Sequence, residues 1–188
     1  MSNKLPLTAG RWTIDPHHTD VGFTVRHLGL SKVRGRFGDV SGSVEIGDDL
    51  DATRVEAVIV LSSVATGNAD RDGHLLSSDF FDAATNPTMT FRSTGVSGQA
   101  EDYTLTGDLT INGVTRPVTL DVEFFGTSEF PMDQSTRAGF TATGELSRKD
   151  FGIEFNMPLG GDKVMISDKV ALELDVQLVA PAADRVDA

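Results

Sequence analysis

Apolar residues recur at every second position along most of the chain, which is the period of a β-strand with one buried face. The clearest stretch runs from Val170 to Leu178, where large apolar side chains alternate with Glu173, Asp175 and Gln177. One face of this stretch is therefore dry and the other is wet. The pattern predicts an antiparallel strand that packs one side against a core.

A tight hairpin is predicted at Asn112-Gly113. Apolar residues alternate from Tyr103 to Ile111, and a second strand pattern returns after the dipeptide. Asn-Gly readily supplies the two positive φ angles of a two-residue turn. The same pattern predicts the following strands: Trp12–Asp15, Val21–Arg26, Arg34–Ile46, Val55–Leu61, Thr88–Thr94, Tyr103–Ile111, Val114–Phe125, Arg137–Leu146, Val164–Ser167 and Val170–Leu178.

The alternation is interrupted by a segment that begins at Asn68. An asparagine side chain at this position suits the N-cap of a helix, and Asp70 and Asp72 fall in the first turn, where negative charge is favourable. Gly73 weakens such a helix by about 1 kcal/mol relative to alanine, so the helix is expected to be short. We expect the segment up to Pro87 to plug or cover one end of the fold.

Strands at this spacing are typical of an all-β sandwich or barrel, and about eight strands close a barrel wide enough for one small ligand. The fold class predicted is an antiparallel β-barrel with a short helical segment near residues 69–82. The length of 188 residues suits one domain, to which we assign residues 1–180. Residues 181–188 are small, polar and charged, and are expected to form a disordered tail.

Composition narrows the function classes. The absence of cysteine excludes disulfides, thiolate metal sites and cysteine nucleophiles. A formal charge of −12 opposes binding to nucleic acid and docking on anionic lipid surfaces. No apolar run reaches the length of a membrane helix or a signal peptide, so we expect no integral membrane span and a cytoplasmic location.

Candidate chemistry is confined to four histidines, His17, His18, His27 and His74, with several aspartates close in sequence. A metal-dependent or acid/base enzyme that uses this His/Asp cluster stays open as an alternative. No spacing presents two imidazoles on one face of an element, and no G-x-S-x-G or phosphate-loop motif is present. Binding is therefore favoured over catalysis, with no catalytic residue, metal ligand or cofactor assigned.

Several blocks, in order and at consistent spacing, carry a family resemblance. They are Trp12-Thr13-Ile14-Asp15-x-x-His18, Val21 to Gly29 with Val33-x-Gly35-x-Phe37, Asp70-Arg71-Asp72-x-His74-Leu75, Asp79-Phe80-Phe81-Asp82 with Asn86-Pro87-x-x-x-Phe91, Gly107 to Val118, and Arg148-x-Asp150-Phe151-Gly152. From Trp12 to Leu178 the chain resembles the YceI-like family. The resemblance implies an extended lipocalin-like antiparallel barrel that binds a polyisoprenoid lipid.

The resemblance also implies a binding site inside the barrel. The residues expected to contact the ligand are Phe23, Val25, His27, Phe37, Arg71, His74, Leu75, Phe80, Phe81, Phe91 and Phe151. Among them, Arg71 and His74 are expected to meet a polar head group, with Asp72 or Asp79 orienting them. The alternative is that Arg71, Asp72 and His74 form a closed network that holds the helix to the barrel mouth.

The expected partner is a polyisoprenoid or related long-chain amphiphile, such as an isoprenoid quinone, held for transport, storage or stress-related handling. A third reading is a structural or interaction protein whose barrel is filled by side chains. Exposed apolar strand faces favour a homodimer.

Overall fold

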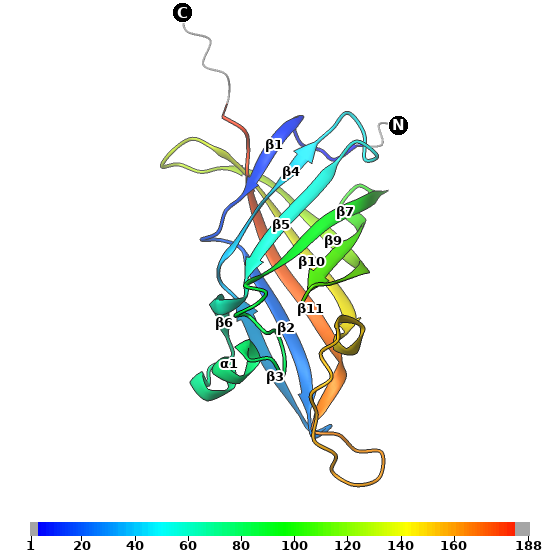
Figure 1. Ribbon diagram of the computed structural model, residues 1–188. Helices are drawn as coiled ribbons and strands as arrows, with labels where there is room; N and C mark the ends of the chain where they lie inside the picture. Colours follow the sequence, from blue (N-terminus) through cyan, green and yellow to red (C-terminus); the bar gives the residue numbers. More distant parts are fainter. Residues whose placement is uncertain (1–3, 183–188) are drawn as a thin grey trace, which may run out of the picture.

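The computed structural model describes residues 4–182, which form one long antiparallel sheet that closes on itself (Figure 1). Eight strands complete the ring, because the last strand pairs with the first. In ring order they are β1 (Gly10–Ile14), β4 (Val40–Ile46), β5 (Arg54–Val60), β7 (Thr88–Gln99), β8 (Asp102–Ile111), β9 (Val114–Glu129), β10 (Thr136–Ser147) and β11 (Ile166–Val179). The predicted eight-stranded barrel is confirmed.

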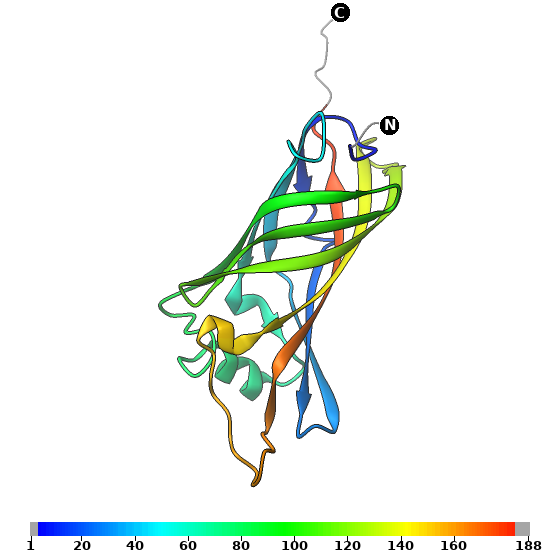
Figure 2. The ribbon, with the colours of Figure 1, turned by 90° about the vertical axis from the view of Figure 1, so that its right-hand side faces the viewer.

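Three further strands lengthen the barrel beyond the ring. They are β2 (Asp20–His27), β3 (Ser31–Phe37) and β6 (Val64–Ala65). Strand β11 is shared, since its C-terminal end pairs with β1 whereas residues 170–175 pair with β2. Strands β1 and β2 therefore follow one another along β11, and the β2–β3 hairpin projects away from the chain termini (Figures 1 and 2).

Two strand boundaries were predicted wrongly. The stretch Arg34–Ile46 is not one strand, because the chain leaves β3 at Gly38-Asp39 and enters β4, which pairs with β1 and β5 in the ring. The stretch Val164–Ser167 is not a separate strand either, since β11 runs unbroken from Ile166. A register irregularity between Ile166 and Val170 interrupts the apolar alternation there.

The interruption at Asn68 is a short helix, α1 (Ala69–Leu76), as predicted. The Asn68 side chain accepts a hydrogen bond from the backbone N–H of Arg71 at 2.9 Å. Two 3₁₀ turns, η1 (Leu61–Ser63) and η2 (Arg148–Phe151), complete the elements. No helix among residues 4–182 is long and apolar enough to cross a membrane, and most of the predicted tail at 181–188 lies outside the described residues.

Asp15 fixes the turn between β1 and β2. Its buried carboxylate lies 2.6 Å from Nη1 of Arg137 on β10 and 2.9 Å from Nδ1 of His18, and it accepts the backbone N–H of His17. His17 and His18 therefore lie in the turn between the two strands. Burial raises the pKa of Asp15, but the hydrogen bonds from His18 and His17 and the charges of His18 and Arg137 outweigh it, so the net pKa is lowered.

Asp15→Asn is expected to lower the free energy of unfolding at pH 7 by about 2 kcal/mol, because the half-buried Arg137 then keeps only the exposed Asp133 as a carboxylate partner. A lowered carboxyl pKa stabilises the fold above the unfolded-state pKa and loses that effect as pH falls through the folded-state value. The difference between wild type and Asp15→Asn should therefore shrink as the pH falls below about 4. Urea unfolding across this pH range measures it, and a constant difference at all pH values would contradict the assignment.

Candidate ligand-binding cavity

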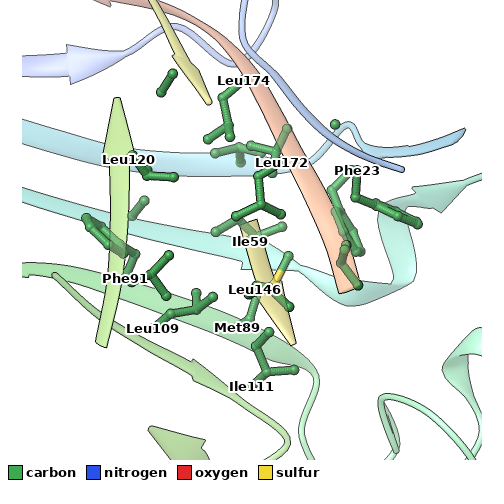
Figure 3. A pocket seen from close by; sticks show the side chains of 18 of the residues that line it. Phe23, Ile59, Met89, Phe91, Leu109, Ile111, Leu120, Leu146, Leu172 and Leu174 are labelled. Atoms are coloured by element: carbon green, nitrogen blue, oxygen red, sulfur yellow. The ribbon is translucent and has the colours of Figure 1, made fainter. Parts of the chain in front are cut away.

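The barrel encloses a cavity of about 630 Å³ that is walled almost entirely by apolar side chains. The alternating residues of each strand that point inward form this wall, and Figure 3 shows leucines, isoleucines, phenylalanines and Met89 converging on the space. Leu172 and Leu174 point inward, whereas Glu173 and Asp175 are exposed, so the predicted dry and wet faces of this strand are confirmed. Cavities of this size hold small organic ligands and cofactors.

One end of the cavity is sealed. Trp12, Leu50, Leu5 and Leu178 belong to a buried cluster in the half of the barrel nearest the termini. The Tyr103 hydroxyl donates to the Ala100 carbonyl at 2.9 Å, and no buried side-chain polar atom in residues 4–182 lacks a hydrogen-bond partner. A ligand therefore meets a dry surface here.

The other end of the cavity is open. The exposed residues that border the cavity are Arg26, Ser31, Arg71 and His74, and they lie on the β2–β3 hairpin and on α1. His27 lines the cavity beside them. Helix α1 covers part of this end, as predicted (Figure 2). The opening combines an apolar interior with basic residues at its rim.

Two inward-facing glycines make room for aromatic rings in the wall. A Cβ atom at Gly107 would lie 2.3 Å from Cζ of Phe91, and one at Gly35 would lie 2.3 Å from Cζ of Phe23. Both glycines sit inside strands, where a close approach of this kind is the usual reason for glycine. They allow the two rings to lie flat against the sheet.

Gly107→Ala is expected to lower the free energy of unfolding by about 1–3 kcal/mol, because the added methyl group forces the Phe91 ring and the adjacent strand to move. The matched control is Gly139→Ala on β10, where the nearest atom to the added methyl is 3.8 Å away. Thermal unfolding of both variants tests this. Equal stability of the two would show that the close approach does not constrain the wall.

The basic residues of α1 are held by separate contacts and do not form one network. Arg71 donates from Nε and Nη2 to the hydroxyl and carbonyl oxygens of Thr66, at 2.7 and 2.9 Å. Asp72 accepts from the hydroxyl and backbone N–H of the same threonine. His74 instead pairs with Asp79 at 2.8 Å. Among residues 4–182, Nη1 of Arg71 has no hydrogen-bond partner, so it is available to an acceptor at the opening.

Arg148 is a buried arginine that joins the segment after η2 to β11 through hydrogen bonds to backbone carbonyl oxygens. It is 5% exposed, and its guanidinium donates to the carbonyl oxygens of Ile153, Phe155 and Ser167 at 2.8–3.0 Å. Burial lowers the pKa of Arg148, while the charge of Asp168 opposes that shift. The arginine thereby fastens the irregular segment after η2 to the start of β11.

All eleven residues expected to contact a ligand lie in the cavity wall. Their contact with a ligand stays a prediction. The sequence reasoning omitted many aliphatic wall residues, although their strand alternation marks them, and it gave Arg148 no role. The omitted aliphatic residues include Ile59, Met89, Leu109, Ile111, Leu120, Leu146, Leu172 and Leu174.

The four histidines do not converge on one site, although His27 and His74 both line the cavity. His18 bonds Asp15 and His74 bonds Asp79, at separate places in the fold. Over residues 4–182, no group of three His or carboxylate side chains is placed to hold a metal ion. The reading of a barrel filled by side chains is wrong, because the large inward side chains stand around an open space.

A closed antiparallel barrel with a dry internal cavity and one polar opening defines a barrel of lipocalin-like type. Comparison with known proteins agrees: the YceI-like domain family matches residues 12–178. A UPF0312 protein of Staphylococcus epidermidis is 37% identical over 169 residues, which are 89% of this chain and 96% of that protein. The chain belongs to the YceI-like family.

Solved structures show the same fold. Burkholderia cenocepacia BcnA superposes with a TM-score of 0.75 at 20% identity, covering 87% of this chain and 98% of that one. A polyisoprenoid binding domain from Saccharophagus degradans superposes with a TM-score of 0.62 at 18% identity, covering 90% and 98%.

Proposed function

We propose that this protein binds a polyisoprenoid-type lipid, with the chain in the barrel cavity and the head group at the basic opening. The observation that carries the proposal is the cavity itself, whose volume of about 630 Å³ is bounded by leucine, isoleucine, valine and phenylalanine. Each buried methylene contributes about 0.8 kcal/mol, so one five-carbon isoprene unit contributes a gross 3–4 kcal/mol. Chain length, more than polar contacts, then sets the affinity.

The head group is assigned to the rim formed by His27, Arg71 and His74. Arg71 offers Nη1, and its other nitrogens are fixed by Thr66, so the guanidinium is already positioned for an acceptor. His74 packs edge-on against Phe80 and Phe155, with ring centroids 5.0 Å apart in each case. This arrangement suits a pyrophosphate or quinone oxygen above an apolar chain.

The name of the Saccharophagus degradans domain supports the ligand class, because that protein has the same fold and is called polyisoprenoid binding. We propose binding for transport, storage or stress-related handling, and not catalysis. The homodimer and the cytoplasmic location stay predictions.

Native mass spectrometry of protein purified from its own host, followed by organic extraction and lipid mass spectrometry, tests the proposal. A bound long-chain isoprenoid or quinone at one molecule per chain is the expected result. An empty chain that also takes up no polyprenyl phosphate or quinone when these are added would overturn it.

A further inference from the structure

The end of the barrel at which the cavity opens also carries most of the exposed apolar side chains. We define the tip as residues 26–32 of the β2–β3 hairpin and residues 157–165 of the loop before β11. Among residues 4–182, five of the eight exposed large hydrophobic side chains lie there. They are Leu28, Leu30, Met157, Leu159 and Val164, with Leu30 79% exposed.

The two segments of the tip form one surface. The backbone N–H of Leu28 donates to the carbonyl of Met165 at 2.8 Å, and His27 lies opposite Ile166 in the strand register. Both views place the hairpin and the loop side by side at the end far from the termini (Figures 1 and 2). Their exposed side chains therefore meet any flat surface together.

The backbone of the hairpin does not explain its leucines. Leu28 has φ of 56°, in the left-handed region where glycine and asparagine are favoured, and it is followed by Gly29 with φ of 68°. The turn conformation does not favour leucine at position 28, and the Leu28 side chain is 41% exposed. Neither the turn geometry nor burial within the chain therefore accounts for leucine at this position.

Positive charge lies directly behind the apolar tip, although the whole chain carries −12. Residues 21–38 contain four basic side chains and no acidic one. Arg26 and Lys32 lie opposite each other on β2 and β3, and Arg34 follows on the same outer face. Arg26, Lys32 and Arg34 have no ion-pair partner among residues 4–182.

The positive charges of Arg26 and Lys32, which lie opposite each other on two strands, repel each other. An anionic surface next to them would offset this repulsion. The carboxylates of Glu173 and Asp175 on β11 lie further from the tip, beside Gly22 and Asp20. At the tip itself, Asp162 and Lys163 are neighbours in sequence, and their opposite charges offset each other. Asp168, which lies on β11 between the residues that pair with His27 and Val25, is already paired with Arg148 and Lys149. The hairpin itself is thus polarised, with Arg26 and Lys32 toward the tip and Asp20 at its far end.

We propose that the tip docks on a bilayer that carries anionic lipid, with the five apolar side chains entering the interface and Arg26, Lys32 and Arg34 facing lipid phosphates. Residues of the tip, including His27, Ser31 and Met165, also line the cavity. Docking therefore places the cavity opening at the membrane surface. The expectation from net charge alone, that anionic lipid surfaces repel this protein, does not hold for this end of the molecule.

Flotation of the full-length protein with vesicles of phosphatidylcholine, with and without phosphatidylglycerol, tests the proposal. We expect the protein to float with phosphatidylglycerol vesicles at low salt and to be released as salt rises. Leu30→Asp is expected to weaken this binding tenfold or more, because the most exposed apolar side chain is lost. Met132→Asp is its control, since Met132 is 87% exposed and lies outside the tip, between β9 and β10.

Charge is tested with two double variants that change the net charge equally. Lys32→Ser with Arg34→Ser is expected to weaken binding about 25-fold, or roughly fivefold for each cation. Arg92→Ser with Arg116→Ser, on the exposed faces of β7 and β9, should leave it unchanged. Equal losses in both double variants, or a wild-type protein that does not float with anionic vesicles at low salt, would overturn the proposal.

Membrane docking and cavity binding are separable in this experiment. Docking appears as protein in the vesicle fraction, whereas lipid uptake appears as lipid in the protein fraction. A protein that floats normally but takes up no polyprenyl lipid retains the docking surface and contradicts only the proposed function.

Discussion

Ala142→Trp is expected to weaken the binding of a polyprenyl lipid by a hundredfold or more while leaving the barrel folded. Ala142 is buried on β10 and lines the cavity, so an indole at this position extends into the space that the lipid chain would occupy. Displacing about one isoprene unit removes a gross 3–4 kcal/mol of hydrophobic contact, which corresponds to roughly a hundredfold or more in affinity. Titration with a fluorescent polyprenyl analogue measures this loss.

The matched control is Ala171→Trp on the neighbouring strand β11. Ala171 is exposed and lies on the outer face, so its indole leaves the cavity unchanged. Both variants must show the wild-type far-ultraviolet circular dichroism spectrum. If Ala142→Trp binds the analogue as wild type does, the cavity is not the binding site and the proposed function fails.

Arg148→Met is expected to lower the free energy of unfolding by about 3–5 kcal/mol, the largest stability effect predicted for this chain. The guanidinium is the hydrogen-bond donor to the carbonyl oxygens of Ile153 and Phe155 in a segment without regular strand pairing. Removing it leaves these acceptors without that partner, and methionine keeps the aliphatic bulk but none of the donors. Urea unfolding measures the change.

Arg116→Met is the control for Arg148→Met. Arg116 is exposed on β9 and donates only to the carbonyl of Thr115 among residues 4–182. Its replacement should change stability by less than about 0.5 kcal/mol. An equally small effect of Arg148→Met would mean that the segment after η2 does not depend on the buried guanidinium.

Local patterns in the sequence determined the strand faces and the tightest turns. Alternation placed Leu172 and Leu174 inside, because successive side chains of a strand point to opposite faces whatever the rest of the fold does. Asn112 and Gly113 adopt φ of 53° and 72°, as their small penalty for positive φ predicts. The helix cap at Asn68 was equally local, since donor and acceptor lie three residues apart.

The sequence motifs also determined the family and, through it, the closed barrel and the general place of the site. All eleven residues expected to face a ligand line the cavity. Five of them stand at inward strand positions that alternation marks, and the other six lie on α1, in the turns after it or on η2, where the family motifs place them. The separate contacts of Arg71 and His74 were not foreseeable. They depend on where Thr66 and Asp79 come to lie around α1.

Only the tertiary structure decided features that join distant segments. The sharing of β11 between β1 and β2 depends on strand pairings between residues more than a hundred positions apart. The alternation of apolar residues shows which face of a strand is buried, but it does not show which strand lies beside it. The role of Arg148 depends on carbonyl groups that no side-chain pattern marks. Whether the barrel is empty depends on how side chains from all strands fill a common volume. Net charge is a sum over the chain, whereas the basic hairpin and the apolar tip lie at one end of the barrel because the fold gathers them there.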